Sequence, residues 1–276
     1  MTQEELREVG AIQLDIMDEV HRLCVKHNLT YYMIAGTLLG AVRHQGFIPW
    51  DLDIDIGMPR ADYERFREIA RNEAAERFTY MNHESYRNYI RPHALMVRND
   101  TKIHLKYDQW NRKVMDLGVY IDIFPLEIAP DEEILRAAKD RKLKKIRRFK
   151  DMSLPYCYSS NAFRRFVHSG IVFLLRWRSV KKLNEKQQKW MQKYSFQQTQ
   201  CICSMASQYT YKKQCMPREV YGTPVLLEFE GRQYYAPREY TQYLTRLYGD
   251  YMQLPPVEKR QANLEIFTSV EFCKRF

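Results

Sequence analysis

The sequence predicts an α+β fold in which a mixed β-sheet is flanked by helices and carries a basic helical insert. Apolar residues at helical spacing predict a long first helix over 3–28. Between residues 134 and 194 helix-favouring residues dominate, and 18 Lys and Arg stand against 3 Asp and Glu, so this insert holds the basic excess of the chain. Runs rich in β-branched and aromatic residues predict strands at 31–35, 52–58, 78–81, 94–97 and 119–126.

Local signals place the remaining elements. Pro59 favours a helix start, Gly249 favours a helix end, and Glu230-Gly231 is a hairpin signal between two short apolar runs. We therefore expect helices at 38–43, 59–72 and 237–248, a loop at 44–49, and a hairpin made by strands 225–229 and 233–235.

Length and composition exclude several classes of protein. With 276 residues, 45% of them hydrophobic, the chain can bury a sizeable core and is not generally disordered. The net charge of +10 indicates an anionic partner. The longest apolar run, 171–175, is far shorter than the ~20 residues that span a bilayer. The six cysteines show no Cys-x-x-Cys spacing for zinc, and we interpret them as reduced thiols of a cytoplasmic protein.

Two carboxylates at alternate positions are the most informative feature. In a strand, Asp53 and Asp55 would project from one face while Ile54 and Ile56 anchor the other. Adjacent carboxylates repel, and a divalent cation such as Mg²⁺ (or Mn²⁺) resolves the conflict while also binding phosphate oxygens. The alternative is a solvated polar strand edge.

The segment before this pair favours the functional interpretation. Gly36 lets a ligand approach the backbone, and Thr37 supplies a hydroxyl and a helix cap. The N–H groups at the start of the next helix would suit a phosphate. A strand, a Gly-Thr turn, a short helix and a strand with Asp-Ile-Asp form the opening unit of nucleotidyltransferase-type folds.

Asp122 is a lone acid in the apolar strand 119–126. It is either a hydrogen-bonded core acid or a third carboxylate that sheet pairing brings beside Asp53 and Asp55. In the second case the three acids would be both catalytic residues and metal ligands.

The order of these motifs resembles the LicD family. The resemblance rests on 35–44, 46–51, 58–60, 120–126, 229–231 and 248–252, and so spans most of the chain. The family usually has an Asp where this sequence has Leu52. The resemblance implies a single LicD-like domain over 1–276, with a nucleotidyltransferase-like core at 1–133, the basic insert at 134–200 and a C-terminal part at 201–276.

The resemblance also implies an activity. LicD-like proteins transfer a phosphorylated alcohol, typically phosphocholine from CDP-choline, to a cell-surface glycan such as lipopolysaccharide or teichoic acid, or to its lipid-linked precursor. We therefore expect a CDP-alcohol donor, a glycan acceptor and Mg²⁺ as cofactor. The residues expected to bind substrate are Gly36, Thr37, Arg43, Trp50 and Asp51.

Other functions remain open at this stage. The donor could be CDP-ribitol, as in fukutin-type relatives, or CDP-glycerol; the reaction could be nucleotidyl transfer from an NTP; or the protein could be a non-catalytic glycan-binding protein of the membrane surface. The basic insert is either a solvated helical surface or a surface for anionic lipid headgroups, and no nucleic-acid module is recognised. We expect a cytoplasmic protein, with peripheral contact at the inner face of the membrane.

Overall fold

The core of the molecule is a mixed sheet whose middle strand is β6. The computed structural model describes residues 3–86, 89–105, 117–154, 157, 159–175, 180–195, 199–207, 209–260 and 267–272. Strands β2 and β6 are parallel, and the other pairings of the sheet are antiparallel. The order is β1 (Tyr32–Met33), β2 (Asp55–Pro59), β6 (Tyr120–Ala129), β4 (Ala94–Arg98) and β3 (Phe78–Met81), with β7 (Cys201–Cys203) on the end of β6 and β8 (Met216–Pro217) on β7.

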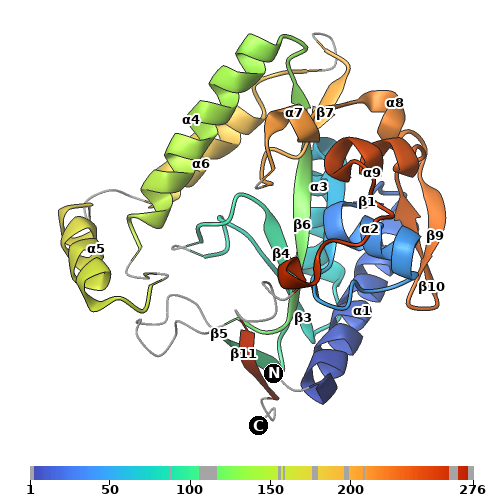
Figure 1. The fold of residues 1–276 in the computed structure, drawn as a ribbon, viewed down its shortest axis with the longest axis horizontal. Helices are drawn as coiled ribbons and strands as arrows, with labels where there is room; N and C mark the ends of the chain where they lie inside the picture. Colours follow the sequence, from blue (N-terminus) through green and yellow to red (C-terminus); the bar gives the residue numbers. More distant parts are fainter. Residues whose placement is uncertain are drawn as a thin grey trace.

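Two groups of helices cover this sheet (Figure 1). Helices α1 (Gln3–Lys26) and α3 (Arg60–Glu73) contact each other and pack on strands of the sheet. The buried residues of α1 recur at helical spacing, which explains why this segment is a helix with one face in the core. Beside β1 and β2 lie α2 (Ala35–His44), the hairpin of β9 (Val225–Phe229) and β10 (Arg232–Ala236), and α9 (Tyr240–Tyr248).

The basic part of the chain forms three helices beside the sheet (Figure 1). Helix α4 (Glu133–Asp151) packs against α6 (Val180–Met191), and α5 (Ala162–Leu175) stands apart from both. Within the described residues, none of the helices combines the length and apolarity needed to cross a membrane. The remaining elements are α7 (Tyr211–Gln214), α8 (Arg218–Tyr221), a 3₁₀ turn (Val257–Lys259), and the two-stranded pairing of β5 (Thr101–Leu105) with β11 (Phe267–Phe272).

The predicted α+β architecture with its basic helical part is confirmed, but two boundaries near the acids differ. Strand β1 ends at Met33 because Ala35 takes a left-handed conformation (φ 47°) and begins α2 there. The prediction that Thr37 caps the helix was therefore wrong: the cap position is Ile34, without a side-chain hydrogen bond. Strand β2 begins at Asp55, later than predicted, because the chain turns at 48–51, where Asp51 N–H donates to the Ile48 carbonyl at 2.9 Å.

Close packing of α2 on the loop that follows it should make Gly40 sensitive to substitution. A Cβ added at Gly40 would lie 2.3 Å from the backbone oxygen of Gly46, so the backbone would have to move. We expect Gly40→Ala to lower the free energy of unfolding by about 1–3 kcal/mol in urea denaturation. Gly170 in α5 is the matched control, because an added Cβ meets no atom within 4 Å. Gly170→Ala should raise stability by up to about 1 kcal/mol, and equal effects at both positions would contradict the packing argument.

Candidate active site

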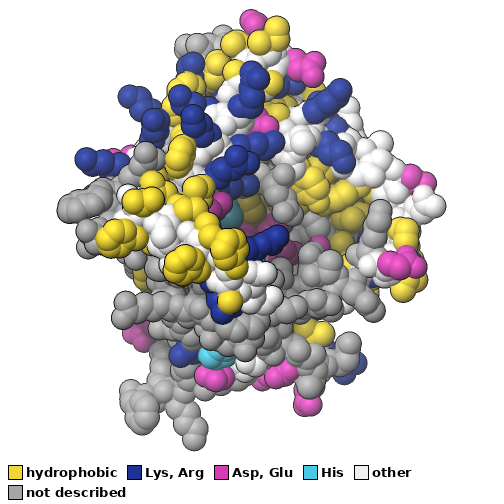
Figure 2. All heavy atoms as spheres, turned by 60° about the vertical axis from the view of Figure 1, so that its left-hand side comes forward, with side chains coloured by type: hydrophobic (Ala, Val, Ile, Leu, Met, Phe, Trp, Pro, Cys, Tyr) yellow, Lys and Arg dark blue, Asp and Glu magenta, His cyan; other side chains and the backbone are white. Residues whose placement is uncertain are grey.

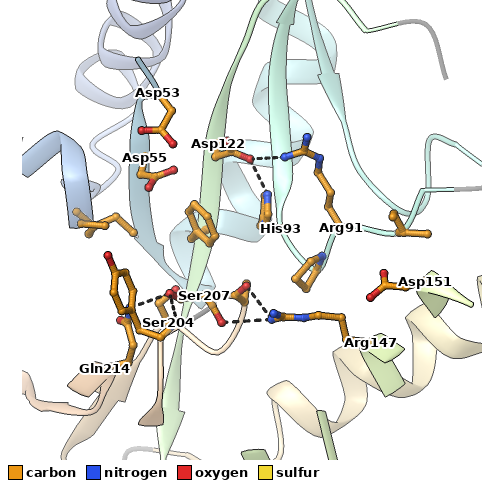
Figure 3. Close-up of a pocket in the computed structure, with 17 residues that line it drawn as sticks. Asp53, Asp55, Arg91, His93, Asp122, Arg147, Asp151, Ser204, Ser207 and Gln214 are labelled. Atoms are coloured by element: carbon orange, nitrogen blue, oxygen red, sulfur yellow. Dashed lines mark hydrogen bonds and ion pairs between the residues drawn. The ribbon is translucent and has the colours of Figure 1, made fainter. Parts of the chain in front are cut away.

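The parallel pairing of β2 with β6 brings Asp55 and Asp122 together. The two residues are register partners on neighbouring strands, and Asp53 lies just before β2. In Figure 3 the side chains of all three point into the same cavity. On the opposite side of the chain Ile54 and Ile56 are fully buried, which fixes the direction of the acids. This acidic cavity has a volume of about 310 Å³.

Asp122 is held by two basic side chains that also line the acidic cavity. Its Oδ1 accepts hydrogen bonds from Arg91 Nη1 at 3.1 Å and from His93 Nε2 at 2.6 Å (Figure 3). Burial alone would raise the pKa of Asp122, but His93 and Arg91 outweigh it and hold the pKa below its usual range. Asp122 is thus both hydrogen-bonded and adjacent to Asp55, and its roles in catalysis and as a metal ligand stay predictions.

The pKa values of Asp53 and Asp55 are shifted in the opposite direction, upward. Burial, then the charges of Asp51 and Asp122, raise the pKa of Asp53 to about 7. Burial and the neighbouring acids raise the pKa of Asp55 well above its ordinary value. Ionising both carboxylates next to each other therefore costs the folded protein free energy.

The donor chemistry of this pair suits a hard divalent cation. Mg²⁺ is commonly bound through one or two carboxylates, with water and substrate phosphates completing its shell. Asp53 and Asp55 provide those carboxylates, and a bound cation would relieve their repulsion. No set of three His, Cys, Asp or Glu side chains in the described part of the chain is already arranged as a metal cage. An ion held by Asp53 and Asp55 would keep room in its shell for water and for the phosphate oxygens of a substrate.

Thr37 holds the backbone of the two acids in place through its hydroxyl. It is buried and lines neither the acidic cavity nor the aromatic cavity described below. Its hydroxyl accepts the Asp55 N–H at 2.7 Å and lies 3.4 Å from the Asp53 carbonyl oxygen. Gly36 is different, because a Cβ there would lie 3.0 Å from Asp51 Oδ2. The absence of a side chain at Gly36 lets the start of α2 approach the Asp51 carboxylate.

A second, aromatic cavity adjoins the acidic one. It has a volume of about 740 Å³, and Tyr209 lies in the wall of both cavities. Tyr209 O–H donates to the Tyr248 hydroxyl oxygen at 3.3 Å, and the Arg260 guanidinium lies 5.2 Å from the centre of the Trp50 ring. Four of the residues predicted to bind substrate line the aromatic cavity: Gly36, Arg43, Trp50 and Asp51. Asp250 lines it as well.

Arg43 also ties two parts of the chain together. Its Nη1 donates to the carbonyl oxygen of Tyr251 at 2.8 Å, which connects α2 to the segment after α9. A phosphate in the aromatic cavity would therefore meet an arginine whose fork is partly engaged.

Three basic residues of the acidic cavity were not predicted to belong to the site. Arg91 and His93 flank Pro92, just before β4, and the antiparallel pairing of β4 with β6 carries them to Asp122. The only sequence signal was two basic residues directly before an apolar strand. Arg147 belongs to the basic run of α4; it lines the acidic cavity and donates to the carbonyl oxygens of Ala206 and Ser207 at 3.1 and 3.2 Å (Figure 3).

The mixed sheet, with two acids in register on parallel strands and a third just before them, defines a candidate enzyme of phosphate chemistry. The model of the family "LicD/FKTN/FKRP, nucleotidyltransferase domain" matches residues 28–150. The chain is 32% identical over 259 residues to the lipopolysaccharide cholinephosphotransferase LicD of Haemophilus influenzae, a match that covers 93% of this chain and 94% of that protein. It is also 50% identical over 54 residues to an uncharacterised protein of Rickettsia typhi, covering 20% of this chain and 18% of that one. The chain therefore belongs to the LicD family, and it is a phosphotransferase.

Proposed function

We propose that this protein transfers phosphocholine from CDP-choline to a cell-surface glycan or its lipid-linked precursor, in a reaction that requires a divalent cation. The observation that carries the proposal is the register of Asp55 with Asp122, with Asp53 beside them, on a cavity that also contains Arg91 and Arg147. The Haemophilus relative, named as a lipopolysaccharide cholinephosphotransferase, supports the choice of phosphocholine and of a glycan.

In this proposal the residues of the acidic cavity have different roles in binding and in catalysis. Asp53 and Asp55 would hold the cation, which neutralises phosphate oxygens when bound. Arg147 and Arg91 are cationic groups in the same wall and would attract the anionic pyrophosphate. The acceptor hydroxyl oxygen forms a bond to the phosphorus of the phosphocholine group, the bond from that phosphorus to the CMP oxygen breaks, and CMP leaves. The hydroxyl proton passes to a carboxylate of the cavity.

The aromatic cavity would receive the choline head group. The Arg260 guanidinium lies 5.2 Å from the centre of the Trp50 ring, so this ring face binds a cation, and the choline head group would have to take the place of the guanidinium. Tyr209 and Tyr248 add further ring surface, and Asp51 adds negative charge beside them. Arg43 and Arg260 also line this cavity, so the choice of a quaternary ammonium rests on the aromatic rings and on the carboxylates of Asp51 and Asp250.

We also propose a cytoplasmic location at the inner face of the membrane. Among the described residues, Cys24, Cys201, Cys203 and Cys215 form no disulfide, which supports a reducing compartment.

A donor panel tests the proposal. The purified protein is incubated with lipopolysaccharide as the acceptor and with CDP-choline, CDP-glycerol, CDP-ribitol or CTP, with and without Mg²⁺, and products are identified by mass. We expect CMP release and phosphocholine transfer with CDP-choline only when Mg²⁺ is present. We also expect CDP-choline with Mg²⁺ to raise the melting temperature, because a ligand that binds only the folded state stabilises it.

The panel separates the competing functions. CMP release with another CDP-alcohol alone would replace choline by that alcohol. Pyrophosphate release from CTP would indicate nucleotidyl transfer, and a melting temperature unchanged by every nucleotide would favour a non-catalytic binding protein. Trp50→Leu is the matched variant for the choline site: it should raise KM for CDP-choline and leave the response to Mg²⁺ alone unchanged.

A further inference from the structure

Helix α5 presents its apolar face to solvent. Five large apolar side chains of this helix are exposed: Phe163 (73%), Phe166 (77%), Val167 (43%), Phe173 (61%) and Leu174 (75%). At about 100° per residue they fall within an arc of roughly 120°. The other side of the helix, which includes Arg165, His168 and Val172, is half-buried, and no residue of α5 is buried.

This orientation reverses the usual arrangement of a surface helix. An amphipathic helix of a globular protein normally turns its apolar stripe to the core. Contiguous exposed apolar surface instead marks a site of interaction with a protein or a membrane. Figure 2 shows hydrophobic side chains gathered on one face of the molecule, on the side where Figure 1 places α5.

Exposed basic side chains lie beside this apolar surface. Figure 2 shows many Lys and Arg side chains on the same face of the molecule. Helices α4 and α6, which precede and follow α5 in the chain, supply exposed bases, and α5 itself adds Arg164. Those of α4 are Arg141, Lys142, Lys144, Lys145 and Arg148, and those of α6 are Lys181, Lys182, Lys186 and Lys189.

We propose that α5 is an interfacial helix that inserts its apolar face into an anionic lipid bilayer, with the bases of α4 and α6 contacting the headgroup phosphates. With 14 residues, α5 is about 21 Å long, so it is too short to cross a hydrocarbon core of about 30 Å and lies in the plane of the membrane. Apolar insertion and attraction to anionic lipid act together in such helices.

The charge distinguishes a bilayer from a second copy of the chain. A symmetric dimer through α5 would bring the same basic surface of two molecules together, and like charges across an interface are unfavourable. An anionic bilayer satisfies both the apolar arc and the basic surroundings.

The apolar surface of α5 is close in sequence to residues that line the acidic cavity. Arg147 and Asp151, near the C-terminal end of α4, line that cavity, and α5 follows α4 in the sequence. Docking through α5 would hold the whole chain, and with it the acidic cavity, at the membrane surface, where a lipid-linked acceptor is concentrated; this consequence rests on the proposed function.

Vesicle flotation tests the inference. The probes are vesicles of phosphatidylcholine alone and vesicles that also contain about 30% phosphatidylglycerol, at low and high salt. We expect the full chain to float with the anionic vesicles at low salt and much less with the neutral ones. The double variant Phe166→Gln/Phe173→Gln should bind at least about tenfold more weakly, because Gln keeps helix propensity while removing the apolar contact.

A matched control removes two exposed apolar side chains elsewhere. Val25 in α1 and Leu226 in β9 are 53% and 54% exposed, and Val25→Gln/Leu226→Gln should bind vesicles like the unmodified chain. Circular dichroism checks that both double variants keep their helix content.

Three results would overturn the inference: no binding of the unmodified chain to anionic vesicles, equal binding of the α5 variant, or a dimer in light scattering that only the α5 variant dissociates. Transfer to a water-soluble acceptor gives an independent readout. It should be unchanged in the α5 variant, because α5 supplies no residue to the acidic or the aromatic cavity. Vesicle binding without any transferase activity would contradict the proposed function and leave the membrane inference intact.

Discussion

Asp53→Asn and Asp55→Asn are each expected to abolish transfer without unfolding the protein. Both variants keep the size of the side chain and remove an anionic oxygen that would hold the cation. Metal stabilisation of transferring phosphate is worth several kcal/mol, so we expect turnover to fall by about 10³-fold or more. The measurement is CMP release under saturating CDP-choline. Glu228→Gln, an exposed carboxylate on β9, is the control and should retain full activity.

The same variants should be more stable than the unmodified protein at neutral and higher pH. The pKa of Asp53 is raised from 3.8 to about 7, so the folded state binds this proton more tightly than the unfolded state does. Stability is therefore lost as pH rises from about 4 through about 7, where the folded protein must ionise the group. The neutral amide introduced by Asp53→Asn has no such ionisation cost. We expect this variant, with chelator present, to have a raised melting temperature above about pH 7 and a nearly unchanged one near pH 4.

Two outcomes would contradict this account. Full activity of Asp53→Asn and Asp55→Asn would remove these residues from the proposed chemistry. A lower melting temperature at about pH 8 would mean that the carboxylates stabilise the fold, contrary to the direction of their pKa shifts.

Chelation is the second change with a large expected effect. We expect EDTA to reduce transfer by about 10³-fold, and Mg²⁺ or Mn²⁺ in excess to restore it, because the pyrophosphate charge would otherwise face Asp53 and Asp55 directly. Ca²⁺ prefers a larger and more flexible oxygen shell and should restore less. The assay is again CMP release, with metal added back to protein dialysed against chelator.

Metal binding itself should depend on pH. A cation competes with the proton for Asp53, whose pKa is about 7, so the apparent affinity for Mg²⁺ should rise between about pH 6 and pH 8. Calorimetry measures it directly, and Asp53→Asn should lose both the affinity and its pH dependence. Full activity in EDTA, or an Mg²⁺ affinity independent of pH in this range, would contradict the proposal that Asp53 and Asp55 bind a cation required for transfer.

The three acids Asp53, Asp55 and Asp122 show which parts of the site the sequence could predict. Alternation along the chain was enough to predict that Asp53 and Asp55 share a side, because that pattern is local. For Asp122 the sequence left two interpretations open, a hydrogen-bonded core acid or a third carboxylate beside Asp53 and Asp55. The pairing of β2 with β6 joins residues far apart in the sequence, and the register depends on how Ile56 and Ile123 pack in the core.

Other features required the folded chain. Arg91 and His93 precede a strand whose neighbour cannot be read from local patterns, so their contact with Asp122 was not predicted. Thr37 was recognised as important, but its hydroxyl binds backbone because α2 begins earlier than the local signals indicated. The apolar and basic composition of the insert was evident, whereas the outward direction of the apolar side of α5 depends on how that helix is docked.

The two cavities are built from different kinds of structure, and this has a consequence for how such a protein can diversify. Asp55 and Asp122 are fixed by a rigid sheet register, whereas Trp50, Asp51 and Tyr209 lie on connecting segments outside the strands. Connecting segments tolerate change more readily than paired strands do. Exchanging these connecting residues would thus allow a different alcohol to be accepted while the phosphate-handling machinery stays intact.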